Sequence, residues 1–215
     1  MEWFLNKDGY QIIRDIISAI QLNKEYLSRI DGEIGDGDHG INMNKGFTIV
    51  SGRINEDSSL TEGFGEIANV LMMEIGGSMG PIYGTFFEVL SEKSRSFDKI
   101  DPYLFNEMLN SATNAVIEIC EAQVGDKTLI DTLVPAVDNF TISLKKNDSF
   151  KDALAAMVEG AREGRDSTLN MAAKKGRSAR LGERSKGVLD AGATSCFIIL
   201  ETMAGSIVRL FKDDR

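Results

Sequence analysis

The chain has 215 residues, of which 42% are hydrophobic, and it carries a formal net charge of −9. This length and composition suffice for one buried core, and no proline- or serine-rich linker divides the sequence, so we expect a single domain over residues 1–215. The negative charge disfavours nucleic acid and anionic membranes as partners, and with neither a leader peptide nor an apolar run of about 18 residues the sequence predicts a cytoplasmic protein.

Apolar residues recur at helical spacing along most of the chain. The pattern predicts helices over about 8–28, 40–53, 61–75, 81–90, 102–121, 129–144, 149–173 and 191–212. Pro135 should bend the sixth of these. Because no stretch combines period-two alternation with an enrichment in β-branched residues, we predict an all-α protein of about eight helices.

The segment between the first two predicted helices is acidic and rich in glycine; it reads Asp31-Gly-Glu-Ile-Gly-Asp36-Gly-Asp38-His39-Gly-Ile-Asn42. Aspartates at relative positions 1, 6 and 8 cannot share one face of a helix or strand, and they converge only where the backbone bends, which glycine permits. Converging carboxylates repel one another, so the segment predicts a hard divalent cation, Mg2+ or Ca2+. A helix that starts near Gly40 would also direct free N–H groups toward an anion, as in a polyphosphate site.

An EF-hand loop and a plain surface turn are the alternatives to a cation site in this segment. An EF-hand loop that began at Asp36 would need oxygen ligands or glycine where Gly40, Ile41 and Phe47 stand, so that motif does not fit. A plain surface turn is the simpler alternative, since aspartate and glycine are ordinary turn residues. The density of both residue types favours the cation site.

One histidine and two cysteines limit the chemistry of the chain. Zinc sites with several histidines are excluded, and a Ser-His-Asp relay would have to use His39 itself. His39 lies beside Asp38 at a predicted helix start, which favours a phosphate contact, with a phosphohistidine carrier as the alternative. Cys120 and Cys196 lack metal-ligand spacing and are expected to be buried, reduced thiols.

A basic segment over residues 174–187 contrasts with the acidic remainder of the chain, because it holds six lysines and arginines and three glycines. It is either a solvated flap or a lid that presents guanidinium groups to an anion, and the length of the segment favours the lid. Other glycine-containing turns lie at 31–40, 76–80 and 124–128, and a small-residue helix start follows at 190–195. If the helices run up and down in a ring, the turns at 31–40, 76–80, 124–128 and 176–192 gather at one end and form a nucleotide site.

Five blocks of sequence together resemble the nucleotide-binding L subunit of dihydroxyacetone kinases. They are Gly35-Asp-Gly-Asp-His-Gly40 with Asn42, Gly76-Gly77-Ser78 with Gly80-Pro81 and Gly84-Thr85, Gly125-Asp-Lys-Thr128, Gly176-Arg177 with Leu181-Gly-Glu-Arg-Ser185, and Asp190 with Gly192-Ala-Thr-Ser195. The blocks occur in the order of the family and span residues 31–195, which is nearly the whole chain.

The resemblance implies an eight-helix antiparallel barrel with a nucleotide, ADP or ATP, at one rim. It assigns two Mg2+ ions to Asp31, Asp36 and Asp38. It places His39, Gly40, Ile41, Asn42, Ser78, Met79, Arg177, Asp190, Ala191 and Gly192 along the nucleotide, and Cys120 and Leu129 beside the adenine. The sequence departs from the family where Met79 replaces a serine, Ala191 a proline and Cys120 a glycine, which suggests a divergent member.

The resemblance also implies partner subunits, since an L subunit does not phosphorylate a ketone alone. A K subunit holds dihydroxyacetone through a histidine, and in bacteria an M subunit of the phosphoenolpyruvate phosphotransferase system donates phosphoryl groups from phosphohistidine to the bound ADP. One alternative is an ATP-exchanging kinase subunit for another short ketose such as erythrulose. The other is a nucleotide-sensing interaction protein without transfer activity. Association of the chain into a homodimer is left open.

Overall fold

The computed structural model describes residues 1–213, and this part of the chain is predominantly helical. The α-helices are α1 (Tyr10–Leu22), α2 (Lys24–Ile34), α3 (His39–Ser51), α4 (Leu60–Glu74), α5 (Met79–Ser94), α6 (Pro102–Cys120), α7 (Ile130–Lys145), α8 (Phe150–Ser167) and α9 (Ala191–Leu210). Three 3-10 helices accompany them: η1 (Asn6–Asp8), η2 (Thr168–Asn170) and η3 (Arg177–Ser185). The prediction of a helical protein is therefore confirmed.

The number of helices differs from the prediction, because residues 1–213 contain nine α-helices where about eight were expected. The stretch 8–28, predicted as one helix, divides at Asn23 into α1 and α2. The Asn23 side chain donates to the carbonyl of Ala19 at 2.9 Å, and such a local bond competes with continuation of a helix. Helix α2 then continues to Ile34, so Asp31 lies in a helix and not in the loop that follows.

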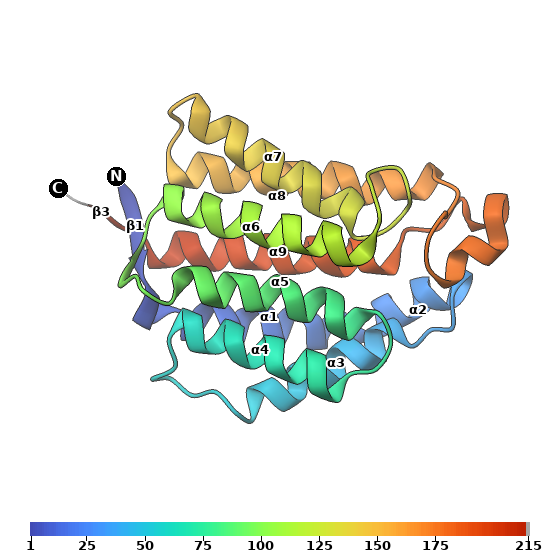
Figure 1. Ribbon diagram of the computed structural model, residues 1–215, viewed down its shortest axis with the longest axis horizontal. Coiled ribbons are helices and arrows are strands. Elements are labelled where there is room, and N and C mark those ends of the chain that lie inside the picture. The colour runs from blue at the N-terminus through green and yellow to red at the C-terminus, as the bar shows by residue number, and fades with distance from the viewer. Residues whose placement is uncertain (214–215) are drawn as a thin grey trace.

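Three short strands also depart from the all-α prediction. They are β1 (Glu2–Leu5), β2 (Lys99–Ile100) and β3 (Lys212–Asp213), and they form an antiparallel sheet in the order β2-β1-β3. With two to four residues each, these strands are too short for period-two alternation to appear in the sequence. They lie at one end of the molecule, away from α2 and the basic segment (Figure 1).

The helices pack side by side in a regular succession (Figure 1). Helix α1 contacts α3, and from α3 onward each helix contacts the next in the chain up to α9, which in turn contacts α1. Helix α2 lies outside this succession and packs against α3 and α9. The apolar faces that helical periodicity predicted therefore point toward one shared core.

The core is filled by aliphatic and aromatic side chains from every one of these helices. In α1, Ile12, Ile13, Ile16 and Ile20 are fully buried. Helix α9 is long and apolar enough to cross a membrane by length and composition, yet 72% of that span is buried inside the protein. We therefore describe α9 as a core helix.

Helices α7 and α8 approach each other closely because glycine lines their contact. A Cβ atom on Gly164 would lie 2.0 Å from the carbonyl oxygen of Asp131, and one on Gly160 would lie 2.5 Å from the carbonyl oxygen of Pro135. Any side chain at either glycine would push the helices apart. This close contact fixes the start of α7, which borders the site described next.

Candidate functional site

Three aspartates, Asp31, Asp36 and Asp38, form a cluster in which one carboxylate oxygen of each lies within 4.8 Å of the others. Asp31 stands on the last turn of α2, while Asp36 and Asp38 lie in the short connection to α3. The predicted convergence of these side chains is thus present in the structure. We refer to these three residues as the aspartate cluster.

Two glycines shape the connection between α2 and α3. Gly37 has a φ of 78°, which residues with a side chain rarely adopt. A Cβ atom on Gly35 would lie 2.6 Å from a carboxylate oxygen of Asp31, so glycine is needed there for space. The bend brings the first turn of α3 against the cluster, where the backbone N–H of His39 donates to Asp31 Oδ2 at 3.3 Å.

Arg177, which begins η3 in the basic segment, reaches the same cluster from a position far away in sequence but beside α2. Its Nη1 pairs with Asp36 Oδ2, and it lies 3.4 Å from Asp38 Oδ2. The basic segment therefore meets the acidic connection, while the lid interpretation, in which it covers an anionic ligand, stays a prediction. Its guanidinium partly balances the charge of carboxylates that would otherwise repel one another.

A cleft of about 410 Å³ opens beside the aspartate cluster, a volume within the ordinary range of small-molecule sites. Its lining includes most of the residues predicted from the sequence: Asp31, Asp36, Asp38, His39, Asn42, Ser78, Met79, Cys120, Leu129, Arg177, Asp190, Ala191 and Gly192. The turns at 31–40, 76–80, 124–128 and 176–192 all contribute to this lining, as their predicted gathering requires.

Two predicted residues, Gly40 and Ile41, do not line the cleft. Gly40 is buried against α2, where a Cβ atom would lie 2.1 Å from the carbonyl oxygen of Lys24. Ile41 on the next position of α3 is 53% exposed. The family resemblance placed both residues along the nucleotide, but successive positions of a helix point in different directions.

The cleft combines a charged lining with an apolar one. The charged side is the aspartate cluster with Arg177 and Lys175. The apolar residues are Met79, Ile82, Cys120, Ala122 and Leu129, and of these Ala122 and Leu129 are buried. Such a lining suits a ligand with an anionic end and a flat, weakly polar end.

Three helices begin at the cleft. The first residue of α3 is His39, that of α5 is Met79, and that of α9 is Ala191, and all three line it. Free N–H groups at helix starts and the positive end of the helix dipole favour anions. The cleft thus offers several positive helix ends close to the aspartate cluster.

His39 is held by two side chains that the sequence interpretation did not connect with it. Its Nε2 and the Oγ of Ser195 are 2.8 Å apart, and Tyr83 OH lies 2.7 Å from the same Oγ. Tyr83 also donates to the carbonyl of Gly192 at 3.0 Å. Burial lowers the pKa of His39 to about 4, opposed in part by the charge of Asp31, so the ring is neutral at pH 7.

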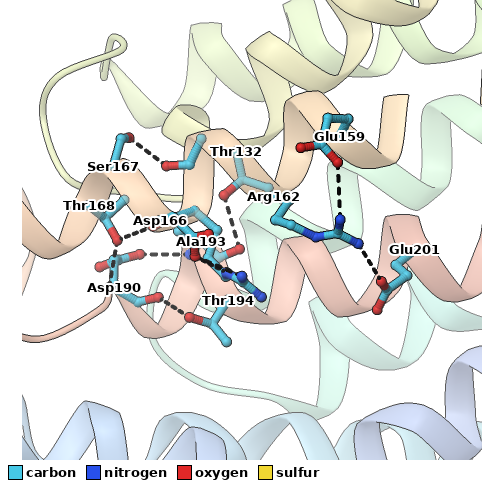
Figure 2. A network of polar contacts seen from close by, with 12 residues as sticks. Thr132, Glu159, Arg162, Asp166, Ser167, Thr168, Asp190, Ala193, Thr194 and Glu201 are labelled. Carbon is cyan, nitrogen blue, oxygen red and sulfur yellow. Dashed lines mark hydrogen bonds and ion pairs between the residues drawn. The ribbon is translucent and has the colours of Figure 1, made fainter. Parts of the chain in front are cut away.

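Asp190 caps the first turn of α9, because its side chain accepts from the backbone N–H of Ala193 at 2.8 Å. Figure 2 shows this bond together with that from Asp190 N–H to Thr168 Oγ1, which measures 3.1 Å. Burial raises the pKa of the Asp190 carboxyl to about 6, although the bond from Ala193 lowers it. The start of α9 is thereby tied to the end of α8.

Two buried charged residues beside the cleft were not singled out from the sequence. Asp131 accepts from the backbone N–H groups of Gly125 at 2.6 Å and Thr128 at 2.7 Å, which fixes the turn before α7. Lys127 in that turn is 1% exposed. The Gly125-Asp-Lys-Thr128 block indicated this turn, but the helical periodicity did not predict that Lys127 and Asp131 would be buried.

The aspartate cluster satisfies the requirements of Mg2+ or Ca2+. Its donors are all carboxylate oxygens, which hard cations prefer to sulfur or nitrogen. Asp36 and Asp38 are about half exposed, so water can complete a coordination shell. A cation held there would face the cleft.

Comparisons with known proteins agree with this chemistry. The family model of the DAK2 domain matches residues 33–205. The chain is 36% identical over 192 residues to the "PEP-dependent dihydroxyacetone kinase, ADP-binding subunit DhaL" of Escherichia coli (strain K12), covering 88% of this chain and 90% of that protein. It is 30% identical to a "D-erythrulose kinase" of Mycolicibacterium smegmatis over 86% of this chain but 32% of that protein.

A solved structure shares the fold. The dihydroxyacetone kinase from C. freundii, crystallised in complex with AMP-PNP and Mg2+, superimposes with a TM-score of 0.68 at 22% sequence identity. The match covers 92% of this chain and 33% of the C. freundii chain, so the chain spans about one third of that protein.

Proposed function

Because the chain belongs to the DAK2 domain family, we propose that it is the ADP-binding subunit of a phosphoenolpyruvate-dependent dihydroxyacetone kinase. The E. coli relative carries that name and matches this chain over 90% of its own length. The observation that carries the proposal is the aspartate cluster at a cleft where α3, α5 and α9 begin. A cation site beside several helix starts suits a magnesium nucleotide better than a smaller ligand.

The wider arrangement follows from the same family membership. The whole chain acts as one domain, and α1 together with α3 through α9 forms a closed antiparallel barrel of eight helices. The succession of contacts from α1 through α3 to α9 and back to α1 supports this arrangement. The cleft then lies at the rim, and we place the protein in the cytoplasm with the other subunits of the system.

In the proposed complex, Asp31, Asp36 and Asp38 hold two Mg2+ ions. Magnesium bound there neutralises charge on the transferring phosphoryl group. The starts of α3, α5 and α9 direct N–H groups toward the phosphates, and the basic segment brings Arg177 to them. Cys120 and Leu129 border the adenine in the apolar part of the cleft.

The proposed reaction is a relay of one phosphoryl group. The phosphorus–nitrogen bond of phosphohistidine on an M-type donor breaks as the terminal phosphate oxygen of ADP bonds to that phosphorus. The γ-phosphorus then bonds to a hydroxyl oxygen of dihydroxyacetone on a K subunit while its bond to the β,γ-bridging oxygen breaks, which regenerates ADP, and the hydroxyl proton goes to a base of that subunit. Positioning and charge stabilisation supply most of the rate in such transfers, so this chain needs no nucleophile.

A reconstitution assay tests the proposal. The chain is mixed with K and M subunits, and the transfer of labelled phosphate from phosphoenolpyruvate to dihydroxyacetone is followed. The E. coli L subunit provides the positive control, and omission of each component provides the negative ones. Transfer that requires this chain supports the proposal; no transfer with partners that work with the E. coli subunit contradicts it.

A kinase subunit for another short ketose is the second candidate, favoured by the similarity to a D-erythrulose kinase. The two candidates differ in how the nucleotide behaves. A coenzyme remains bound through gel filtration and is rephosphorylated in place, whereas a substrate exchanges with free ATP. ADP retention, followed by the same assay with erythrulose, separates them.

A further inference from the structure

Lys127 is a buried cation that is surrounded by backbone carbonyl groups. Its ammonium donates to the carbonyl oxygens of Thr168 at 2.9 Å, Met171 at 3.2 Å, Ser185 at 2.7 Å and Val188 at 2.7 Å. The side chain is 1% exposed. Although Lys127 lines the cleft, its N–H groups are thus directed to the protein backbone and not to a ligand.

The four carbonyls belong to the two ends of the basic segment. Thr168 and Met171 precede it, Ser185 lies near its end, and Val188 directly follows it. Two further bonds join the same ends: Gly187 N–H donates to the carbonyl of Leu169 at 2.7 Å, and Ala173 N–H donates to Ser185 Oγ at 2.8 Å. The Lys127 ammonium therefore lies between the start and the end of the basic segment, where both join the helical core.

The position of Lys127 is itself fixed by the turn that carries it. The two bonds that Asp131 accepts from this turn hold it to α7. Lys127 has a φ of 63°, a conformation that aims its side chain inward at a local backbone cost. On the far side, Thr168 also accepts from the backbone of Asp190, so the same contacts extend to α9 (Figure 2).

Arg177 is the residue of the basic segment that meets the aspartate cluster. The position of Arg177 depends on where the two ends of the segment lie. We propose that Lys127 is a positioning residue whose ammonium acts as an internal monovalent cation, ties the two ends of the basic segment together and thereby holds Arg177 at the aspartate cluster. Without it, several buried carbonyls lose their donor, and the segment separates from the body.

Chemical rescue provides the first test, and it is independent of any nucleotide. Lys127→Gly removes the side chain at a positive φ that glycine adopts freely, and it leaves space for n-butylammonium, which reproduces the missing group. Lys127→Met keeps an unbranched chain of similar length, so the space stays filled while the charge and donors are lost. Hydrogen exchange of peptides over 171–190 is measured in buffer free of potassium and ammonium, with peptides over 60–94 as the internal control.

We expect amide exchange in 171–190 to accelerate by on the order of tenfold or more in both variants while 60–94 stays unchanged, because local opening exposes only the segment. Addition of n-butylammonium should restore protection in Lys127→Gly and not in Lys127→Met. Unchanged exchange in Lys127→Gly, equal acceleration in both regions, or failure of the amine to restore protection would each overturn the proposal.

A double-mutant cycle provides the second test, and this arm rests on the proposed function. If Lys127 acts through Arg177, Lys127→Gly should weaken magnesium-dependent ADP binding by about tenfold, equal to about 1.4 kcal/mol. In an Arg177→Gln background the same change should cost less than about twofold, since the two residues act on one step. Equal losses in both backgrounds would show that Lys127 contacts the nucleotide directly or supports the fold as a whole. A wild-type chain that binds no ADP would refute the proposed function, while the exchange experiment would still decide the role of Lys127.

Discussion

Neutralisation of Asp36 separates two effects of the aspartate cluster, the repulsion among its carboxylates in the ligand-free protein and its proposed binding of a metal ion. At 4.8 Å each pair of like charges costs about 0.9 kcal/mol at the permittivity of water, the appropriate limit because the Asp36 side chain is 46% exposed. Asp36→Asn removes two such repulsions, about 1.7 kcal/mol in total, and loses an exposed ion pair with Arg177 worth at most about 1 kcal/mol. The free energy of unfolding of the ligand-free protein should therefore rise slightly, by about 1 kcal/mol.

The effect on ligand binding should be opposite and larger. Residues that only support a metal ligand typically cost about 10–100-fold in metal affinity when changed, so loss of a direct carboxylate ligand should weaken magnesium-dependent ADP binding by about 100-fold, or about 2.8 kcal/mol. Isothermal titration calorimetry with magnesium and with EDTA measures this change, and urea denaturation measures stability. EDTA should reduce the wild-type affinity to about that of the variant.

The matched control is Asp57→Asn, the same chemical change on an exposed aspartate between α3 and α4. It should alter neither ADP affinity nor the response to EDTA. If Asp36→Asn bound magnesium ADP as tightly as the wild type, the assignment of the aspartate cluster to a metal would be wrong.

Three further outcomes follow from the structure. Burial raises the pKa of Asp190 from 3.8 to about 6. Ionisation of Asp190 therefore lowers the free energy of unfolding of the ligand-free protein above about pH 6, and this loss disappears as the pH falls toward about 4. Asp190→Asn should raise the free energy of unfolding near pH 8 by up to about 3 kcal/mol and flatten its pH dependence in urea titrations. A methyl group at Gly164 would meet the carbonyl of Asp131 at 2.0 Å, so Gly164→Ala should cost about 1–3 kcal/mol of stability, whereas Gly205→Ala on the exposed side of α9 should add about 0.5–1 kcal/mol; equal effects would contradict the close helix contact. Burial raises the pKa of Cys120 to about 11, so iodoacetamide should alkylate it more slowly at pH 7 than it alkylates free cysteine, and ADP should slow the reaction further; a reaction as fast as that of free cysteine would show an open thiol.

Local sequence patterns predicted most of the helices because burial imposes a 3.6-residue period on an amphipathic helix. The period did not reveal the break at Asn23, where a side-chain bond to Ala19 ends α1 although the apolar pattern continues. It also missed β1 and its partners, whose pairing joins residues about 100 and 200 positions apart and leaves no local signal. Long-range pairing is therefore the part of the fold that local periodicity did not predict.

The candidate site shows the same limit. The spacing of Asp31, Asp36 and Asp38 predicted their convergence, because glycines and a following helix start determine that geometry locally. The contacts that complete the site lie far apart in sequence: His39 meets Ser195 across 156 residues, and Arg177 meets Asp38 across 139. No spacing rule links such pairs, so the residue types favoured an anion-binding lid without indicating that Arg177 contacts the aspartate cluster.

The central position of α9 has a consequence for synthesis of the protein. This helix contacts α1, α7 and α8, and most of its residues are buried. A nascent chain that has not yet released residues 191–210 from the ribosome presents the matching apolar faces of those helices to water. Chaperones that recognise exposed apolar surface should hold such stalled chains and release them once α9 is complete.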